Sequence, residues 1–125
     1  MKTVLIIDED RLFLAYISEC TSERCTDLEV VTCDNRYRGL AAIHSDIDLL
    51  GLEMPGIDGR KLLNYAQSKG INRSRIIILS GHDADYLHDC ISIGECLAVM
   101  NKHDVRQKAV LDMIFDSLQQ ESVDA

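Results

Sequence analysis

The sequence lacks most features of a secreted, disulfide-bonded or membrane-spanning protein. Its 125 residues contain no tryptophan and one proline, and no apolar run approaches the roughly 20 residues that a membrane span needs. The first apolar run ends at Asp8, which is too short for a signal peptide. Five cysteines form an odd set without a CxxC pair, so neither a disulfide framework nor a zinc site is indicated. We therefore expect a cytoplasmic protein.

Basic residues are also scarce. Lysine and arginine number 13 against 21 aspartate and glutamate residues, which gives a formal net charge of -8. Such a surface repels phosphate backbones and anionic lipid, so direct nucleic-acid binding and membrane binding are not expected. With 46% hydrophobic and 27% charged residues the composition is that of a globular protein. The length fits one domain, expected over residues 1–119 with a polar, frayed tail at 120–125.

Short apolar runs alternate with stretches of helical spacing along the whole chain. The runs predict strands near residues 4–7, 28–33, 47–52, 75–79 and 97–100. The helical stripes are Phe13, Tyr16, Ile17, Cys20; Tyr37, Leu40, Ala41, His44; Leu62, Leu63, Ala66; Leu87, Cys90, Ile91, Gly94; and Ala109, Val110, Met113, Ile114, Ser117, Leu118. Asp58, and Asp104 with Gln107, are expected to cap helices, and Gly70 to end one. This alternation predicts an α/β fold, a doubly wound parallel sheet in a three-layer α/β/α sandwich.

Polar residues follow each apolar run at the carboxyl ends of the predicted strands, where open parallel sheets bind ligands. Hard oxygen ligands such as carboxylates hold Mg²⁺, while lysine and serine contact phosphate oxygens. The spacing therefore favours a metal-assisted phosphate pocket. The residues are Asp8 and Glu9 after the first run, Gly51 and Glu53 at the third, Ser80 after the fourth, and Asn101 with Lys102 after the fifth.

These motifs resemble the receiver domains of two-component response regulators, and the resemblance spans nearly the whole chain. It is carried by VLIIDED at 4–10, DLLGLEMPGIDG at 48–59, IIILSGH at 76–82 and Lys102. The resemblance implies a five-stranded, flavodoxin-like sheet of order 2-1-3-4-5. It also implies phosphorelay signalling, with Asp8 and Glu9 as the acidic pocket and Ser80 and Lys102 as the phosphate-binding residues.

The covalent phosphate acceptor that the resemblance implies is missing. The family's aspartate lies four residues before the loop proline, and here that position is Gly51, which has no side chain to phosphorylate. Placing Glu53 in this role would set it two residues nearer Pro55 and disrupt the Met-Pro-Gly alignment, so Gly51 is preferred. The domain is then a pseudo-receiver.

Other departures agree with a degenerate site. The family's aromatic switch position is Val99, which lacks a ring's buried area and polar tip, and the family's Lys-Pro pair is Lys102-His103. The resemblance implies metal ligands Asp8, Glu9 and the backbone carbonyl of Glu53. With one carboxylate lost we expect only weak Mg²⁺ binding and no required cofactor.

We therefore expect a phosphorylation-independent, non-enzymatic interaction module that contacts a protein partner or a covalently attached output domain. A ligand-switched or partner-switched receiver is a second interpretation; the segment at 80–85 faintly resembles receivers attached to cyclic-di-GMP phosphodiesterases. The alternative from another class is a haloacid-dehalogenase-like phosphatase, with Asp8 as nucleophile, Asp10 as general acid, and Ser80 and Lys102 binding phosphate. The four histidines, His44, His82, His88 and His103, share no metal-binding spacing.

Overall fold

The computed structural model describes residues 2–53, 59–80 and 96–124. The strands are β1 (Lys2–Ile7), β2 (Leu28–Cys33), β3 (Leu49–Glu53), β4 (Ile76–Ser80) and β5 (Ala98–Asn101). The helices are α1 (Arg11–Arg24), α2 (Arg36–Ala41), α3 (Gly59–Ser68), the 3₁₀ turn η1 (Arg73–Arg75) and α5 (Val105–Asp124). The helix predicted around Leu87 to Gly94, and the cap predicted at Asp58, lie outside the described residues.

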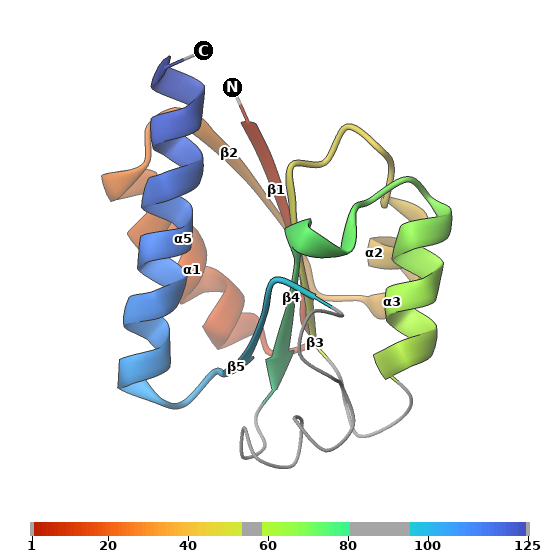
Figure 1. Ribbon diagram of the computed structural model, residues 1–125. Helices are drawn as coiled ribbons and strands as arrows, with labels where there is room; N and C mark the ends of the chain where they lie inside the picture. Colours follow the sequence, from red (N-terminus) through yellow and green to blue (C-terminus); the bar gives the residue numbers. More distant parts are fainter. Residues whose placement is uncertain (1, 54–58, 81–95, 125) are drawn as a thin grey trace.

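All five strands run parallel in one sheet, in the order β2-β1-β3-β4-β5. This confirms the predicted sheet and its order. Helices α1 and α5 cover one face, and α2 and α3 cover the other (Figure 1). The carboxyl ends of the strands therefore meet at one edge of the sheet, where the polar residues of the sequence collect.

The core has two apolar layers because alternate residues of each strand face opposite sides. In one layer, even-numbered β1 residues such as Val4 and Ile6 pack with Ile17 of α1 and Phe115 of α5. In the other, Leu5 and Ile7 pack with Leu63 and Ala66 of α3. The predicted α3 stripe is confirmed, and Gly70, with a φ of 95°, follows that helix in the conformation that glycine adopts most readily.

The stripe predicted for α1 is wrong in part. The buried residues are Leu14, Ile17 and Thr21, while Tyr16 is 45% exposed. Asp10 caps the helix by accepting a hydrogen bond of 3.1 Å from the Phe13 backbone N–H. Apolar residues occupy more than one side of this helix, so its sequence fits more than one buried stripe. Packing buries the side that includes Thr21, whose hydroxyl donates a hydrogen bond of 2.6 Å to the Ile17 carbonyl.

The prediction for α2 is also wrong in part. The helix ends at Ala41, before His44, and Tyr37 is 82% exposed. Gly39 is the buried residue, and a Cβ atom there would lie 2.6 Å from Ile7 side-chain atoms. The helix backbone therefore lies against the Ile7 side chain of β1. The spacing of apolar side chains could not predict this contact, because glycine has no side chain.

The last helix differs from prediction in two ways. It continues to Asp124, so residues 120–124 of the predicted frayed tail are helical, and Glu121 among them forms an ion pair with Lys2 at 3.5 Å. Asp104 accepts a hydrogen bond from the Arg106 N–H at the helix start, as a cap does. The buried residues are Leu111 and Phe115, whereas the predicted stripe residues Val110 and Met113 are 46% and 66% exposed.

Candidate functional site

The carboxyl ends of β1 and β5 bring Asp8 and Lys102 together. The Lys102 ammonium lies 3.1 Å from Oδ1 and 2.9 Å from Oδ2 of Asp8. Asp8 is 1% exposed and the Lys102 side chain is 4% exposed, so this is a buried ion pair. Lys102 also lies over the ring of Phe13, 5.2 Å from its centre, which gives the ammonium a cation–π contact.

Glu53 enters the same pocket with its side chain. Its Oε1 lies 3.7 Å from the Lys102 ammonium, and its Oε2 accepts a hydrogen bond of 2.9 Å from the Glu9 backbone N–H. The role predicted for the Glu53 backbone carbonyl stays a prediction, and the structure adds to it a carboxylate that the last residue of β3 directs toward Lys102.

The register of the sheet explains why Glu53 lies here. Ile7 pairs with Leu52 at the end of the β1–β3 ladder, so the following residues, Asp8 and Glu53, stand at the same level. Both have the same alternation as the even-numbered β1 residues and face the α1 and α5 side of the sheet. Glu53 thus stands level with Asp8 at the carboxyl end of the sheet.

Gly51 lies two residues deeper in β3, between Ile6 of β1 and Ile77 of β4. A Cβ atom at this position would contact Leu79 at 3.4 Å and Ile6 at 3.5 Å. Its surroundings are apolar, with a small cavity of about 10 Å³ beside it. Gly51 thus lies one strand alternation below Glu53, on the same face of the sheet, and its assignment to the acceptor position stays a prediction.

The carboxyl groups of this pocket titrate far from their ordinary ranges. Burial, together with the hydrogen bond to Glu53, raises the pKa of Asp8 to about 7, against the opposing effects of the Asp10 N–H and Lys102. Burial opposes ionisation of Glu53 as well, but hydrogen bonds from Asp8 and the Glu9 N–H hold its pKa below the ordinary value. Of the two carboxyl groups, Asp8 therefore takes up a proton more readily than Glu53 does.

The other predicted site residues lie around this centre. The Glu9 side chain is 65% exposed and 4.0 Å from Arg36. Ser80 is fully buried, and its carbonyl accepts a 2.8 Å hydrogen bond from the Lys102 backbone N–H. Val99, the predicted switch position, is partly buried in the layer beneath α3. His44 and His103 are exposed; His82 and His88 lie outside the described residues.

The predicted metal ligands do not form a ready divalent-cation site. Lys102 already places a positive charge against both Asp8 oxygens, and its ammonium lies close to Glu53. Among the residues that the structure describes, no group of three His, Cys, Asp or Glu side chains could hold a metal. Weak Mg²⁺ binding stays a prediction, since a metal ion would compete with the ammonium for the same oxygens.

Phe13 is a contributor to the pocket that the sequence did not indicate. It was assigned to a core stripe but lies under the Lys102 ammonium. Asp10, named above as the general acid of the alternative phosphatase, approaches Lys102 to 3.8 Å while it caps α1.

No protein-family model matches the sequence, and no curated protein is detectably similar to it. Solved structures do match in fold. A CheY-like receiver domain from Methanospirillum hungatei shares 20% identity over 100% of this chain and 99% of its own, with a TM-score of 0.70. The response regulator TrrA from Thermotoga maritima, bound to Mg²⁺-BeF, shares 23% over 90% and 96%, with a TM-score of 0.64. CheY6 of R. sphaeroides, bound to the P1 domain of CheA3, shares 23% over 95% and 97%, with a TM-score of 0.63.

The sheet order and the helix layers define a doubly wound α/β protein of the flavodoxin-like class. Within that class, the chain has the fold of response regulator receiver domains. Among the described residues, no helix has the length and apolar character that crossing a membrane requires.

Proposed function

We propose that this domain is a pseudo-receiver: a module of two-component-type signalling that contacts a protein partner, or an attached output domain, without being phosphorylated. The observation that carries the proposal is the position of Glu53. It fills the strand end beside Asp8 and Lys102, while Gly51 lies deeper among apolar side chains. CheY6, which has the same fold, is bound to another signalling protein, and this supports a protein partner here.

The pocket is occupied by its own side chains in a way that opposes phosphoryl transfer. A phosphoryl group on a carboxylate must be neutralised by a cation and by lysine. Here Lys102 is bound to both Asp8 oxygens, and Glu53 is held by the Glu9 N–H. The carboxylate of Glu53 supplies a permanent negative charge at the strand end, which favours one fixed state of the domain over a switched pair.

A phosphatase that uses Asp8 as its nucleophile is the alternative from another class. The environment of Asp8 weighs against it. The carboxyl group is 1% exposed, its pKa is raised to about 7, and Lys102 covers both oxygens. A nucleophilic carboxylate must be ionised and accessible to substrate. The raised pKa of Asp8 opposes its ionisation, and its burial opposes access. Phosphate-ester hydrolysis that disappears in Asp8→Asn would favour the enzyme over the pseudo-receiver.

The proposal is tested by incubating the protein with acetyl phosphate and Mg²⁺ and measuring its intact mass. A competent carboxylate attacks phosphorus, and acetate leaves. The wild type is expected to gain no phosphoryl group. Glu53→Asp is expected to gain one, because it places a shorter aspartyl carboxylate level with Asp8 and leaves room for the incoming group.

Gly51→Asp serves as the matched variant. The sheet register predicts that it stays unmodified, since its side chain would enter the apolar layer at Leu79 and Ile6. Circular dichroism verifies that each variant is folded before it is scored. A base-labile adduct on the wild type would contradict phosphorylation independence, and an adduct on Gly51→Asp but not on Glu53→Asp would restore Gly51 to the acceptor position.

A further inference from the structure

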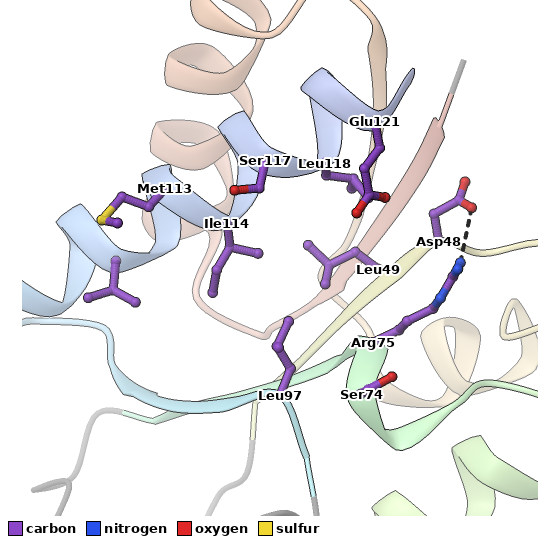
Figure 2. Close-up of a pocket in the computed structure, with 11 residues that line it drawn as sticks. Asp48, Leu49, Ser74, Arg75, Leu97, Met113, Ile114, Ser117, Leu118 and Glu121 are labelled. Carbon is purple, nitrogen blue, oxygen red and sulfur yellow. Dashed lines mark hydrogen bonds and ion pairs between the residues drawn. The ribbon is translucent and has the colours of Figure 1, made fainter. Parts of the chain in front are cut away.

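A groove opens at the end of the sheet opposite the acidic pocket. It has a volume of about 560 Å³ and lies between α5, the start of β3, the η1 turn and the residue before β5 (Figure 2). Leu49 is buried at its floor, and Ile114 from α5 and Leu97 point toward one another across it. The volume lies within the roughly 300–1,000 Å³ range of protein binding pockets.

Helix α5 has more apolar surface than the sheet covers. Leu111 and Phe115 face the core, whereas Val110 and Met113 remain 46% and 66% exposed along the groove. The lining from Val110 to Glu121 covers roughly 16 Å of helix length. A groove of this length suits several side chains of a peptide segment rather than one compact ligand.

Charged residues form the rim at one end of the groove. Arg75 lies 3.3 Å from Asp48, and Lys2 lies 3.5 Å from Glu121. Each of these two acids therefore forms an ion pair with a basic residue far from it in the sequence. The Glu121 side chain is 65% exposed and that of Lys2 only 22%, so the carboxylate faces solvent more than its partner does. Of the three charged residues in the lining, Asp48 and Glu121 are acidic and Arg75 is basic, and the whole chain carries a net charge of -8, so both favour a basic ligand.

A second copy of this chain is a poor occupant for the groove. Two copies repel one another, because each carries a charge of -8. The exposed large apolar side chains at the groove are Leu97, Val110 and Met113. A stable interface generally buries about 20–30 residues on each side, far more than these three.

We propose that this groove binds a peptide segment of a partner protein that inserts apolar side chains against α5 and carries more basic than acidic residues. This inference rests on the proposed function, because it names a partner surface for an interaction module. It assigns binding to the end of the sheet remote from Asp8 and Lys102.

The probe is a displayed library of random 12-residue peptides. The full chain is the target, and Met113→Gln is the counter-selection target, because it keeps the side-chain length and helix propensity but removes apolar character at a 66% exposed position. Selection is expected to enrich peptides with at least two large apolar residues and an excess of lysine and arginine. The best peptide is then synthesised and titrated calorimetrically.

Matched variants separate the groove from the rest of the surface. Met113→Gln is expected to weaken binding about fivefold or more, and Leu12→Gln, which changes an 85% exposed leucine on α1, to leave it unchanged. Glu121→Gln is expected to weaken binding about twofold at low salt, and Glu19→Gln, with the same charge change on exposed α1 surface, to have a smaller effect. Thermal melting verifies the fold of each variant.

Amide chemical shifts of the full chain locate the bound peptide. Shifts at Leu49, Ile114 and Leu118 support the groove. Shifts confined to the surroundings of Asp8 and Lys102 would overturn it while leaving the interaction module intact. Enrichment of acidic peptides, or no enrichment of wild type over Met113→Gln, would also overturn it. Sedimentation that shows a dimer abolished by Met113→Gln would assign the groove to a second copy instead.

Discussion

The ion pairs at the two ends of the sheet differ in burial. At the carboxyl end, Asp8 and the Lys102 side chain are 1% and 4% exposed and lie within 3.1 Å of one another. At the amino end, Arg75 is 49% exposed and reaches Asp48 at 3.3 Å. A buried pair is costly to break because its remaining member stays unpaired in a poor solvent, whereas water replaces a lost partner at the surface.

The two ends also differ in how many strands their charged side chains connect. The buried cluster of Asp8, Glu53 and Lys102 holds three strand ends together, since its members come from β1, β3 and β5. The exposed lining residues of the groove at the other end, such as Met113, take no part in that cluster.

The largest effect is expected from Lys102→Met. The variant removes the cation and leaves Asp8 and Glu53 facing one another. We expect a loss of about 3–5 kcal/mol in the free energy of unfolding at pH 8. At pH 5 the loss should be smaller, because Asp8 can then hold a proton. Urea denaturation at both pH values measures it, and equal losses would contradict proton uptake by Asp8.

A charge placed in the apolar core, between the two ends of the sheet, should lower the free energy of unfolding nearly as much. Gly51→Asp puts a carboxylate against Leu79 and Ile6, and we expect it to destabilise the protein by about 3 kcal/mol. Gly51→Ala is the control: its methyl group fits at ordinary contact distances and restricts the unfolded chain. It should stabilise by about 0.5–1 kcal/mol. If Gly51→Asp were as stable as the wild type, its side chain would have to reach the polar pocket.

The pH dependence of stability should come from the carboxyl end. The folded protein holds the Asp8 proton up to about pH 7, while the unfolded chain releases it near the ordinary value of 3.8. The folded state therefore binds more protons in this window, and stability falls as pH rises from about 4 to 7. The lowered pKa of Glu53 acts with the opposite sign, and at lower pH.

Asp8→Asn tests this assignment because the amide does not titrate. The difference between its free energy of unfolding and that of the wild type should change steadily from pH 4 to 7 and stay constant above pH 8. A difference that is independent of pH would show that Asp8 is ionised throughout.

The smallest effect is expected at the amino end. Arg75→Met removes one exposed ion pair with Asp48 and should change the free energy of unfolding by no more than about 0.5 kcal/mol. Asp48 keeps its 2.8 Å hydrogen bond from the Thr3 backbone N–H. Denaturation beside Lys102→Met under the same conditions gives the ratio of the two effects, and comparable losses would remove the distinction between the two ends.

The strands and their order could be predicted from the sequence because short apolar runs that end abruptly in polar residues are typical of a parallel sheet. The run ending at Asp8 and the isoleucines of β4 are of this kind. The helical faces were harder. In α1 and α5 apolar residues occupy more than one side, and only packing against the sheet selects Ile17 and Phe115 over Tyr16 and Met113.

The composition of the polar pocket was predicted in part. Asp8 and Lys102 follow strands that lie on either side of the sheet centre, and parallel strands bring their carboxyl ends together. The role of Glu53 depended on strand register, which a loop motif does not determine. The loop match at Pro55 assigned Gly51 to the acceptor position, which stays a prediction, and the pairing of Ile7 with Leu52 adds Glu53 to the pocket. Counting in steps of two from Leu49, which shares a face of the sheet with Ile6, also leads to Glu53.

The contact between Gly39 and Ile7 has a mechanical consequence. The backbone of α2 at Gly39 lies against the Ile7 side chain, with no side chain of its own between them. A larger residue at position 39 would therefore push α2 away from the sheet, beside the strand residue that precedes Asp8.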